Sequence, residues 1–370
     1  MIPYFALLLI PLGIQILLKV SHTQIRISKN RDTIDANKVA LPAFFFILLL
    51  LLVLRSESIG RDLSNYKVIF NAIGNGRPLQ SWYEVTEPIF LLYNWMVFHY
   101  ISTDFQIFIA ITAVISVIPI AYVYNQDSNQ GYLKAAVFVN MSTFIMLFSG
   151  LRQALAMSFA LLAYQALKEG KMWRFMVWSL VVILTHHSGF IVLLFYPLYK
   201  MHFYKRDLIW IIPCSLAVVF LRREIFNILS VVLGSVSEKY GDMAGNTRAF
   251  GSFLLFTLFT VFCYIIEDEN IMDAEAFALR NILTFATVIQ SFASLNPFAM
   301  RMNYYFILLI PYAIGKAIQC ARHKYLQAAK AGEIVIAVYF TYIFFSETYH
   351  SYVTGISTLD TVPYIPFWKG

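Results

Sequence analysis

Long apolar runs separated by short polar loops dominate the pattern of this chain. Helices with about 20 apolar residues cross the hydrocarbon layer of a membrane, so such runs predict membrane spans. We therefore expect an all-α, polytopic membrane protein. Twelve runs are expected to cross: 2–20, 39–54, 105–124, 133–148, 152–167, 173–185, 189–199, 208–221, 250–266, 276–294, 302–318 and 334–345.

Two further apolar stretches are expected not to cross. Residues 89–100 are only about a dozen residues long, which favours a short re-entrant or interfacial helix in the first long outer loop over a span. Residues 225–236 form the apolar middle of a later outer loop. We expect them to form an amphipathic helix that lies on the membrane.

Basic residues orient the predicted helices. They gather in the loops 19–38, 168–174, 200–206 and 322–330. The positive-inside rule assigns these loops to the cytoplasm, so both ends of the chain are expected outside. We predict a single integral membrane domain, 1–370, in which outer loops of about 55–104 and 222–249 and the tail 347–370 form an outward-facing site.

The composition supports this class, since 59% of the residues are hydrophobic and 13% are charged. The net charge of +7 follows from the basic loops, so we expect no nucleic-acid partner. The cytoplasmic loops hold no glycine-rich phosphate loop, dinucleotide fingerprint or paired aspartates at metal spacing, so we expect no cofactor and no metal. Cys214, Cys263 and Cys320 lie in or beside apolar runs and are interpreted as packing residues.

Two arginines stand at the outer ends of predicted helices. Arg152 begins a helix whose N-terminal amides point the same way, a combination suited to an oxyanion such as phosphate. Arg301 lies at a similar depth, so the two could clamp a diphosphate, since each guanidinium can hold two oxygens. The alternatives are an interfacial or structural role for Arg152, and pairing of Arg301 with Glu87 or Asp62.

Candidates for acid–base chemistry also lie on the outer face. His186 and His187 end an outgoing helix, and one of them could act as general acid or base or donate to a phosphate. Adjacent helical residues point about 100° apart, so the pair should not bind one metal. Asp62 follows Arg61, which would hold its carboxylate ionised and ready to accept a hydroxyl proton. A hydrolase built on Ser188 lacks a nucleophile-elbow pattern.

Other polar residues of the outer face are candidates for substrate binding: Arg61, Glu87, Gln153, His187, Lys239 and Arg248. Aromatic residues at 82–83 and 349–368 could stack on sugars, although tryptophan and tyrosine are also common at membrane interfaces.

With these residues considered together, the chain resembles the EpsG family of Wzy-type polysaccharide polymerases. The resemblance covers most of the chain and rests on the order and spacing of short motifs: Gly60-Arg61-Asp62 with Tyr66 and Phe70, Glu87-Pro88-Ile89-Phe90, Gly150-Leu151-Arg152-Gln153-Ala154-Leu155-Ala156, Gly170-Lys171, His186-His187-Ser188, and Arg301 with Tyr304. Gly189 departs from the pattern, because such proteins often have alanine after the serine.

The resemblance implies a GT-C-like membrane glycosyltransferase of the bacterial cytoplasmic (inner) membrane. It implies metal-independent, inverting transfer on the outer face, facing the periplasm or exterior. The substrates would be undecaprenyl-diphosphate-linked glycans as donor and acceptor, as in O-antigen, lipopolysaccharide or exopolysaccharide synthesis, with membrane lipid and a chain-length-regulating co-polymerase as further candidate partners.

The resemblance also implies roles for individual residues. Arg152 and Arg301 would hold the diphosphate, and either Asp62 or His186 would accept the proton of the acceptor hydroxyl. Glu87 would position sugar hydroxyls or an arginine. Tyr66 and Tyr304 are added as candidate substrate contacts.

Two other functions remain open from the sequence. An O-antigen ligase shares outer arginines and a histidine but usually has a long late outer loop, whereas the loop 222–248 is short. A flippase or transporter of lipid-linked sugars would place its cations near mid-membrane and show repeat symmetry, and no repeat is visible here.

Overall fold

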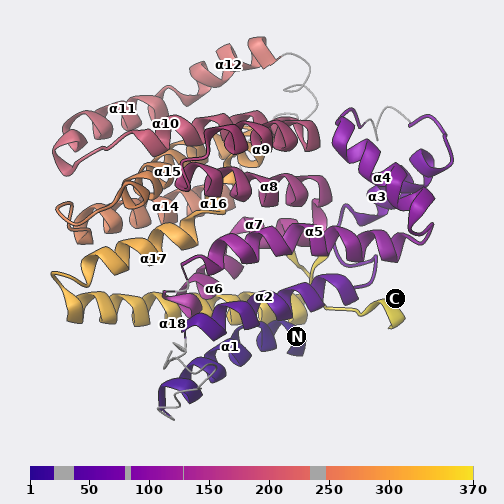
Figure 1. Cartoon of the computed structure of the whole chain (residues 1–370), viewed down its shortest axis with the longest axis horizontal. Coiled ribbons are helices and arrows are strands. Elements are labelled where there is room, and N and C mark those ends of the chain that lie inside the picture. The colour runs from indigo at the N-terminus through magenta and orange to yellow at the C-terminus, as the bar shows by residue number, and fades with distance from the viewer. Residues whose placement is uncertain (21–36, 80–84, 128, 234–246, 370) are drawn as a thin grey trace. The chain divides into compact units, whose positions relative to one another are not determined.

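The computed structural model describes residues 1–20, 37–79, 85–127, 129–233 and 247–369, and over these residues the protein is helical (Figure 1). Within that part of the chain the only extended pairing is an isolated antiparallel bridge between Arg55 and Pro366. The expected all-α class is confirmed.

Contacts divide the chain into two compact units, one of residues 1–189 and 333–370 and the other of residues 190–332. The first unit holds α1 (Ile2–Val20), α2 (Asn37–Leu54), α3 (Leu63–Gly74), α4 (Pro88–Tyr100), α5 (Phe105–Asn125), α6 (Gly131–Val139), α7 (Ser142–Ser149), α8 (Leu151–Lys168), α9 (Met172–Thr185), the larger part of α18 (Leu326–Thr354), η5 (Thr358–Asp360) and η6 (Phe367–Lys369).

The second unit holds α10 (Phe195–Lys200), η3 (Lys205–Asp207), α11 (Leu208–Phe220), α12 (Arg222–Leu233), α14 (Thr247–Ile266), α15 (Ala274–Gln290), η4 (Ser291–Ser294), α16 (Pro297–Ile307) and α17 (Ile310–Ala321). The helix η2 (His187–Leu194) connects the units in sequence.

Helix α8 is the centre of the first unit. It packs against α5, α7 and α9, and most of its side chains are buried. At the N-terminal end of α8, Leu151 and Leu155 join a cluster formed by the buried faces of α3 and α4 and the start of α5. Since Arg152 lies on this same first turn, the cluster fixes the position of α3 and α4 beside it.

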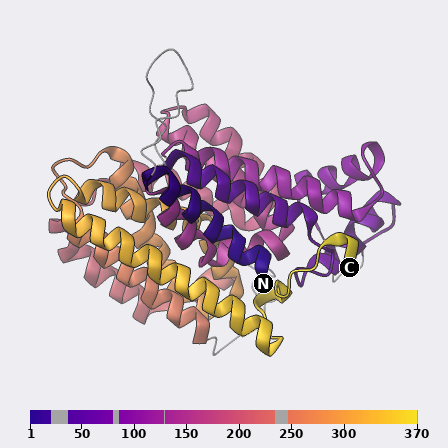
Figure 2. The same cartoon turned by 90° about the horizontal axis from the view of Figure 1, so that it is seen from below.

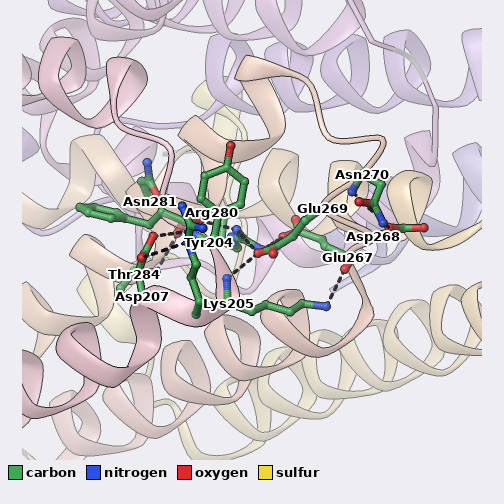
Figure 3. A network of polar contacts seen from close by, with 12 residues as sticks. Tyr204, Lys205, Asp207, Glu267, Asp268, Glu269, Asn270, Arg280, Asn281 and Thr284 are labelled. Atoms are coloured by element: carbon green, nitrogen blue, oxygen red, sulfur yellow. Dashed lines mark hydrogen bonds and ion pairs between the residues drawn. The ribbon is translucent and has the colours of Figure 1, made fainter.

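In the second unit, the buried guanidinium of Arg280 on α15 holds two loops together (Figure 3). Its Nη1 lies 3.2 Å from Glu267 Oε2, its Nη2 lies 2.8 Å from Glu269 Oε1, and Nη2 also donates to the carbonyl of Phe203. Lys205 Nζ donates to the carbonyl of Glu267 over 2.8 Å. The loops at 203–205 and 267–269 therefore lie side by side.

Three helices among the described residues are long and apolar enough to cross a membrane: Phe105–Asn125, Ala274–Ser294 and Leu326–Thr354. Two bent pairs, α6 with α7 and α16 with α17, raise the number to five if each pair is one span. Shorter apolar helices occur at Ile2–Leu18, Lys38–Leu54, Met172–Thr185 and Phe250–Ile266. These helices fit a membrane protein, while the twelve crossings and the GT-C-like arrangement stay predictions.

Several predicted runs are divided. The run 133–148 bends by 65° between α6 and α7, where the Asn140 side-chain amide donates to the carbonyls of Ala136 and Phe340. The run 302–318 bends by 41°, and Pro311 at the start of α17 cannot donate a backbone hydrogen bond to the preceding helix. The run 189–199 is the 3₁₀ helix η2 followed by α10. A polar residue accompanies the first of these breaks and a proline the second.

The predicted tail 347–370 starts later than expected, because α18 continues to Thr354 and ends before Gly355, whose φ is +69°. The remaining residues run back to the end of unit 1 that carries α3 (Figures 1 and 2). The backbone N–H groups of Ser56, Gly60 and Arg61 donate to the carbonyls of Ile365, Asp360 and Leu359, over 2.8, 3.2 and 2.9 Å. The tail therefore fixes the segment 56–61.

Candidate functional site

Glu87 lies at the centre of the candidate site. It precedes α4, is 3% exposed, and each carboxylate oxygen has a partner from a distant part of the chain. Arg152 Nη1 donates to Oε2 over 2.8 Å, and His186 Nδ1 lies 3.1 Å from Oε1. Arg152 belongs to the first turn of α8, and His186 directly follows α9. Three of the residues predicted from separate motifs are thus in direct contact.

Electrostatics fixes the charge of Glu87. Burial by itself would raise its pKa, but the hydrogen bond from His186 and the charge of Arg152 outweigh burial and lower the pKa to about 2. The carboxylate is therefore ionised at neutral pH and can only accept hydrogen bonds. It follows that His186 carries a proton on Nδ1, which makes Nε2 the basic nitrogen of the neutral ring.

Glu87, Phe90 and Tyr66 all contact Arg152. Its side chain is 21% exposed, with Cζ 5.8 Å from the centre of the Phe90 ring. Its backbone N–H donates to the hydroxyl of Tyr66 over 3.4 Å, and Tyr66 comes from the buried face of α3. A guanidinium has five N–H donors, and Glu87 accepts one of them.

Asp62 meets the same stretch of chain through Ser149. The Ser149 hydroxyl donates to Asp62 Oδ2 over 3.1 Å, and the Asp62 backbone N–H donates back to Ser149 Oγ over 3.2 Å. Gly60 allows this contact: its φ is +115°, and a Cβ there would lie 2.2 Å from the carbonyl oxygen of Phe148. The motif containing Asp62 therefore packs directly against the residues that precede Arg152.

Arg61 does not pair with Asp62 among the residues that the structure describes. Its Nε lies 3.2 Å from Asp360 Oδ2 of the tail, in an exposed pair. The sequence argument assumed that neighbours along the chain share charge, but Asp62 turns toward Ser149 while Arg61 turns toward the tail.

The two histidines have different partners, as expected for adjacent residues. His187 Nε2 lies 2.7 Å from the hydroxyl of Thr86, the residue before Glu87, and this contact is exposed. Ser188 is buried, and its hydroxyl lies 3.5 Å from Gln153 Oε1 as a weak donor. Gln153 thus lies beside Ser188, the residue that follows the two histidines.

The other predicted residues are located elsewhere. Arg301 and Tyr304 lie one turn apart on α16, in the second unit, and both are partly buried. Lys239 lies outside the described residues, and Arg248 lies in α14 with a side chain that the structure does not describe. The joint diphosphate clamp of Arg152 and Arg301 stays a prediction.

Sequence reasoning missed Ser149, Thr86 and Arg55. Arg55 is fully buried, and its Nη1 donates over 3.1 Å to the carbonyl of Leu147, near the end of α7. Serine and threonine give no signal of their own in a single sequence. An arginine that directly follows an apolar run was a detectable signal, because burial of its charge requires a partner.

Comparison with known proteins gives a family. The model of the EpsG family matches residues 38–365, a range that contains every residue of the site described above. No curated protein and no solved structure matches the chain. The protein belongs to the EpsG family, a family of Wzy-like polysaccharide polymerases.

Proposed function

We propose that this protein joins undecaprenyl-diphosphate-linked oligosaccharide repeat units into a polysaccharide on the outer face of the bacterial cytoplasmic membrane. The contact of Glu87 with both Arg152 and His186 carries the proposal, since it unites an anion-binding group and a proton acceptor in a chain of a polymerase family.

The reaction is a glycosyl transfer. An acceptor hydroxyl oxygen attacks the anomeric carbon of the donor, a glycosidic bond forms, and the bond from that carbon to the lipid diphosphate breaks. The hydroxyl proton passes to a base on the protein, and the diphosphate leaves with the bonding electrons. Attack opposite the leaving group inverts the anomeric carbon, and we propose that no metal is required.

Arg152 binds the diphosphate in this proposal. The first turn of α8 directs backbone N–H groups toward the same end of the helix as the guanidinium, and both favour negative charge. Glu87 holds the guanidinium in one orientation, so its remaining donors are preorganised for the charge that develops on the leaving group. Arg301 and Tyr304 are proposed to complete the diphosphate site, with Lys239 and Arg248 as further contacts to the glycan.

His186 is the preferred base. The ionised Glu87 keeps the proton on Nδ1, which prepares Nε2 to accept the hydroxyl proton and stabilises the imidazolium that results. Asp62 is the second candidate, because its carboxylate is held by Ser149 at the start of α3. Gln153, His187, Tyr66 and Arg61 are proposed to bind or orient sugars around these groups.

The test uses a strain that lacks this protein and is complemented with the wild-type chain. A polymerase restores a ladder of surface glycan, and its absence leaves lipid carrying a single repeat on the outer face. Repeats that accumulate on the inner face would instead identify a flippase. Finished polymer that stays on its carrier lipid would identify a ligase. Asp62→Asn and His186→Ala are then compared at equal membrane levels, and a normal ladder in both variants would contradict both base assignments.

A further inference from the structure

Helix α3 presents two different faces. Leu63, Tyr66 and Phe70 point into the hydrophobic cluster, and the hydroxyl of Tyr66 contacts the backbone of Arg152. The residues between them are exposed and follow helical spacing on the opposite face: Ser64, Lys67, Val68 and Asn71. The buried face therefore supports the candidate site, while the exposed face has no role in the account above.

A cavity of about 450 Å³ opens over this exposed face. It is lined by Glu57, Ser58, Leu63, Ser64, Lys67, Val68 and Asn71. Its volume lies in the range of roughly 300–1,000 Å³ that is usual for small-molecule sites.

The lining matches a sugar ring. Lys67 Nζ lies 2.8 Å from Glu57 Oε1, so the wall offers an ammonium donor and a carboxylate acceptor whose charges balance. Serine hydroxyls and the Asn71 amide both donate and accept, as sugar hydroxyls do. Val68, which is 47% exposed, supplies apolar surface for the C–H face of a ring. The balanced charge of Lys67 and Glu57 disfavours a bare diphosphate.

The cavity adjoins the candidate site through Asp62. Ser58 and Leu63, which line the cavity, flank the segment that holds Asp62, and Asp62 stands at the N-terminal end of α3. A ring bound over Ser64 would thus lie near the Asp62 end of the helix, with Arg152 on the other side of α3.

We propose that this cavity is a subsite for one sugar residue of the lipid-linked glycan, and that it orients the repeat unit relative to Asp62. The inference rests on the proposed polymerase function and adds where the glycan is recognised. Val68 and Asn71 are then residues that determine the affinity for the repeat unit.

The experiment measures polymerisation by the full-length protein in liposomes. The probe is the lipid-linked repeat that accumulates in a strain lacking this protein. Val68→Trp fills the cavity, and Val177→Trp on α9 is the matched control because the two valines are 47 and 48% exposed. We expect Val68→Trp to raise KM by about tenfold and to leave kcat within about twofold, while Val177→Trp changes neither. The repeat oligosaccharide released from its lipid should inhibit the wild type more strongly than Val68→Trp.

The outcomes separate the two proposals. If the wild type forms no polymer, the proposed function is wrong. If the wild type forms polymer and Val68→Trp has the KM of the control, the subsite is wrong and the function stands. If Val68→Trp does not reach the membrane, Asn71→Ala removes one amide without added bulk. It should raise KM by about threefold, and an unchanged KM would overturn the subsite.

Discussion

The hydroxyl of Ser149 donates a hydrogen bond to the carboxylate of Asp62 over 3.1 Å, across 87 positions of sequence. Ser149 is the last residue of α7, and Arg152 follows three positions later on α8. The short segment 149–152 thus contains both Ser149, the partner of Asp62, and Arg152, the partner of Glu87. This relationship makes Ser149 a positioning residue for the candidate site.

Ser149→Ala should therefore lower the polymerisation rate by about three- to tenfold, because Asp62 loses the donor that orients it. Ser158→Ala is the matched control, since Ser158 is a buried serine whose hydroxyl donates to the carbonyl of Leu155 within its own helix. Both variants should reach the membrane at wild-type level. Equal rates in the two variants would mean that the orientation of Asp62 does not matter.

The lowered pKa of Glu87 implies that the stability of the protein depends on pH. Its folded pKa of about 2 lies below the ordinary 4.5, so ionised Glu87 stabilises the fold fully above about pH 5, and this contribution is lost as the pH falls from about 4.5 toward 2. At pH 7, Glu87→Gln should lower the free energy of unfolding by roughly 2 kcal/mol, since Arg152 loses its ionised partner. Thermal unfolding in detergent at pH 7 and pH 3 checks this. The difference in stability between wild type and Glu87→Gln should be smaller at pH 3 than at pH 7. An equal difference at both pH values would contradict the ion pair.

Alanine substitutions at Gly60 and Gly76 distinguish the effect of a steric conflict from that of an unfavourable backbone angle. Both have positive φ, +115° and +63°, but only a Cβ at Gly60 meets the backbone, 2.2 Å from the carbonyl oxygen of Phe148. Gly76→Ala should cost about 1 kcal/mol of stability for the unfavourable φ alone. Gly60→Ala should cost more and abolish the glycan ladder, because the segment before Asp62 must move. A normal ladder in Gly60→Ala would show that this packing is dispensable.

We expect the buried ion network around Arg280 to stabilise the fold. Arg280→Met leaves Glu267 and Glu269 without their guanidinium, and the loss of one member of a buried pair costs about 3–5 kcal/mol. Arg206→Met, at a side chain 81% exposed, should change stability by less than about 0.5 kcal/mol. Melting temperatures of the two variants in detergent test the difference. Similar melting temperatures would mean that the network contributes little.

Much of the helical pattern could be predicted from apolar runs, because burial in lipid or protein requires long hydrophobic stretches. The run 2–20 coincides with α1, and the short run 89–100 is the short helix α4. The bend at Asn140 was missed because it depends on a side-chain bond to Phe340, 200 positions away. The tail was expected to share a site with the loop of about 55–104, but its backbone pairing with Ser56 was not predicted, because backbone pairing carries no residue-specific signal.

Several residues of the candidate site could be selected from the sequence, but their pairings could not. Charge at the end of an apolar helix marked Arg152, and histidine at a helix end marked His186. That Glu87 joins them depends on the packing of α4 against α9 and on the cluster that fixes α3, contacts between distant segments. The partner expected for Asp62 was its neighbour Arg61, whereas the fold supplies Ser149.

The central claim is that the forked geometry of the Arg152 guanidinium, held by Glu87, binds the leaving diphosphate. Arg152→Lys tests it most directly, because lysine keeps the charge and loses the fork. Arg174→Lys on α9, at a side chain 48% exposed, is the control. The readout is the surface-glycan ladder in a strain without the native protein, at equal membrane levels. We predict single repeats for Arg152→Lys and a full ladder for Arg174→Lys. A full ladder for Arg152→Lys would contradict the claim and direct attention to Arg301.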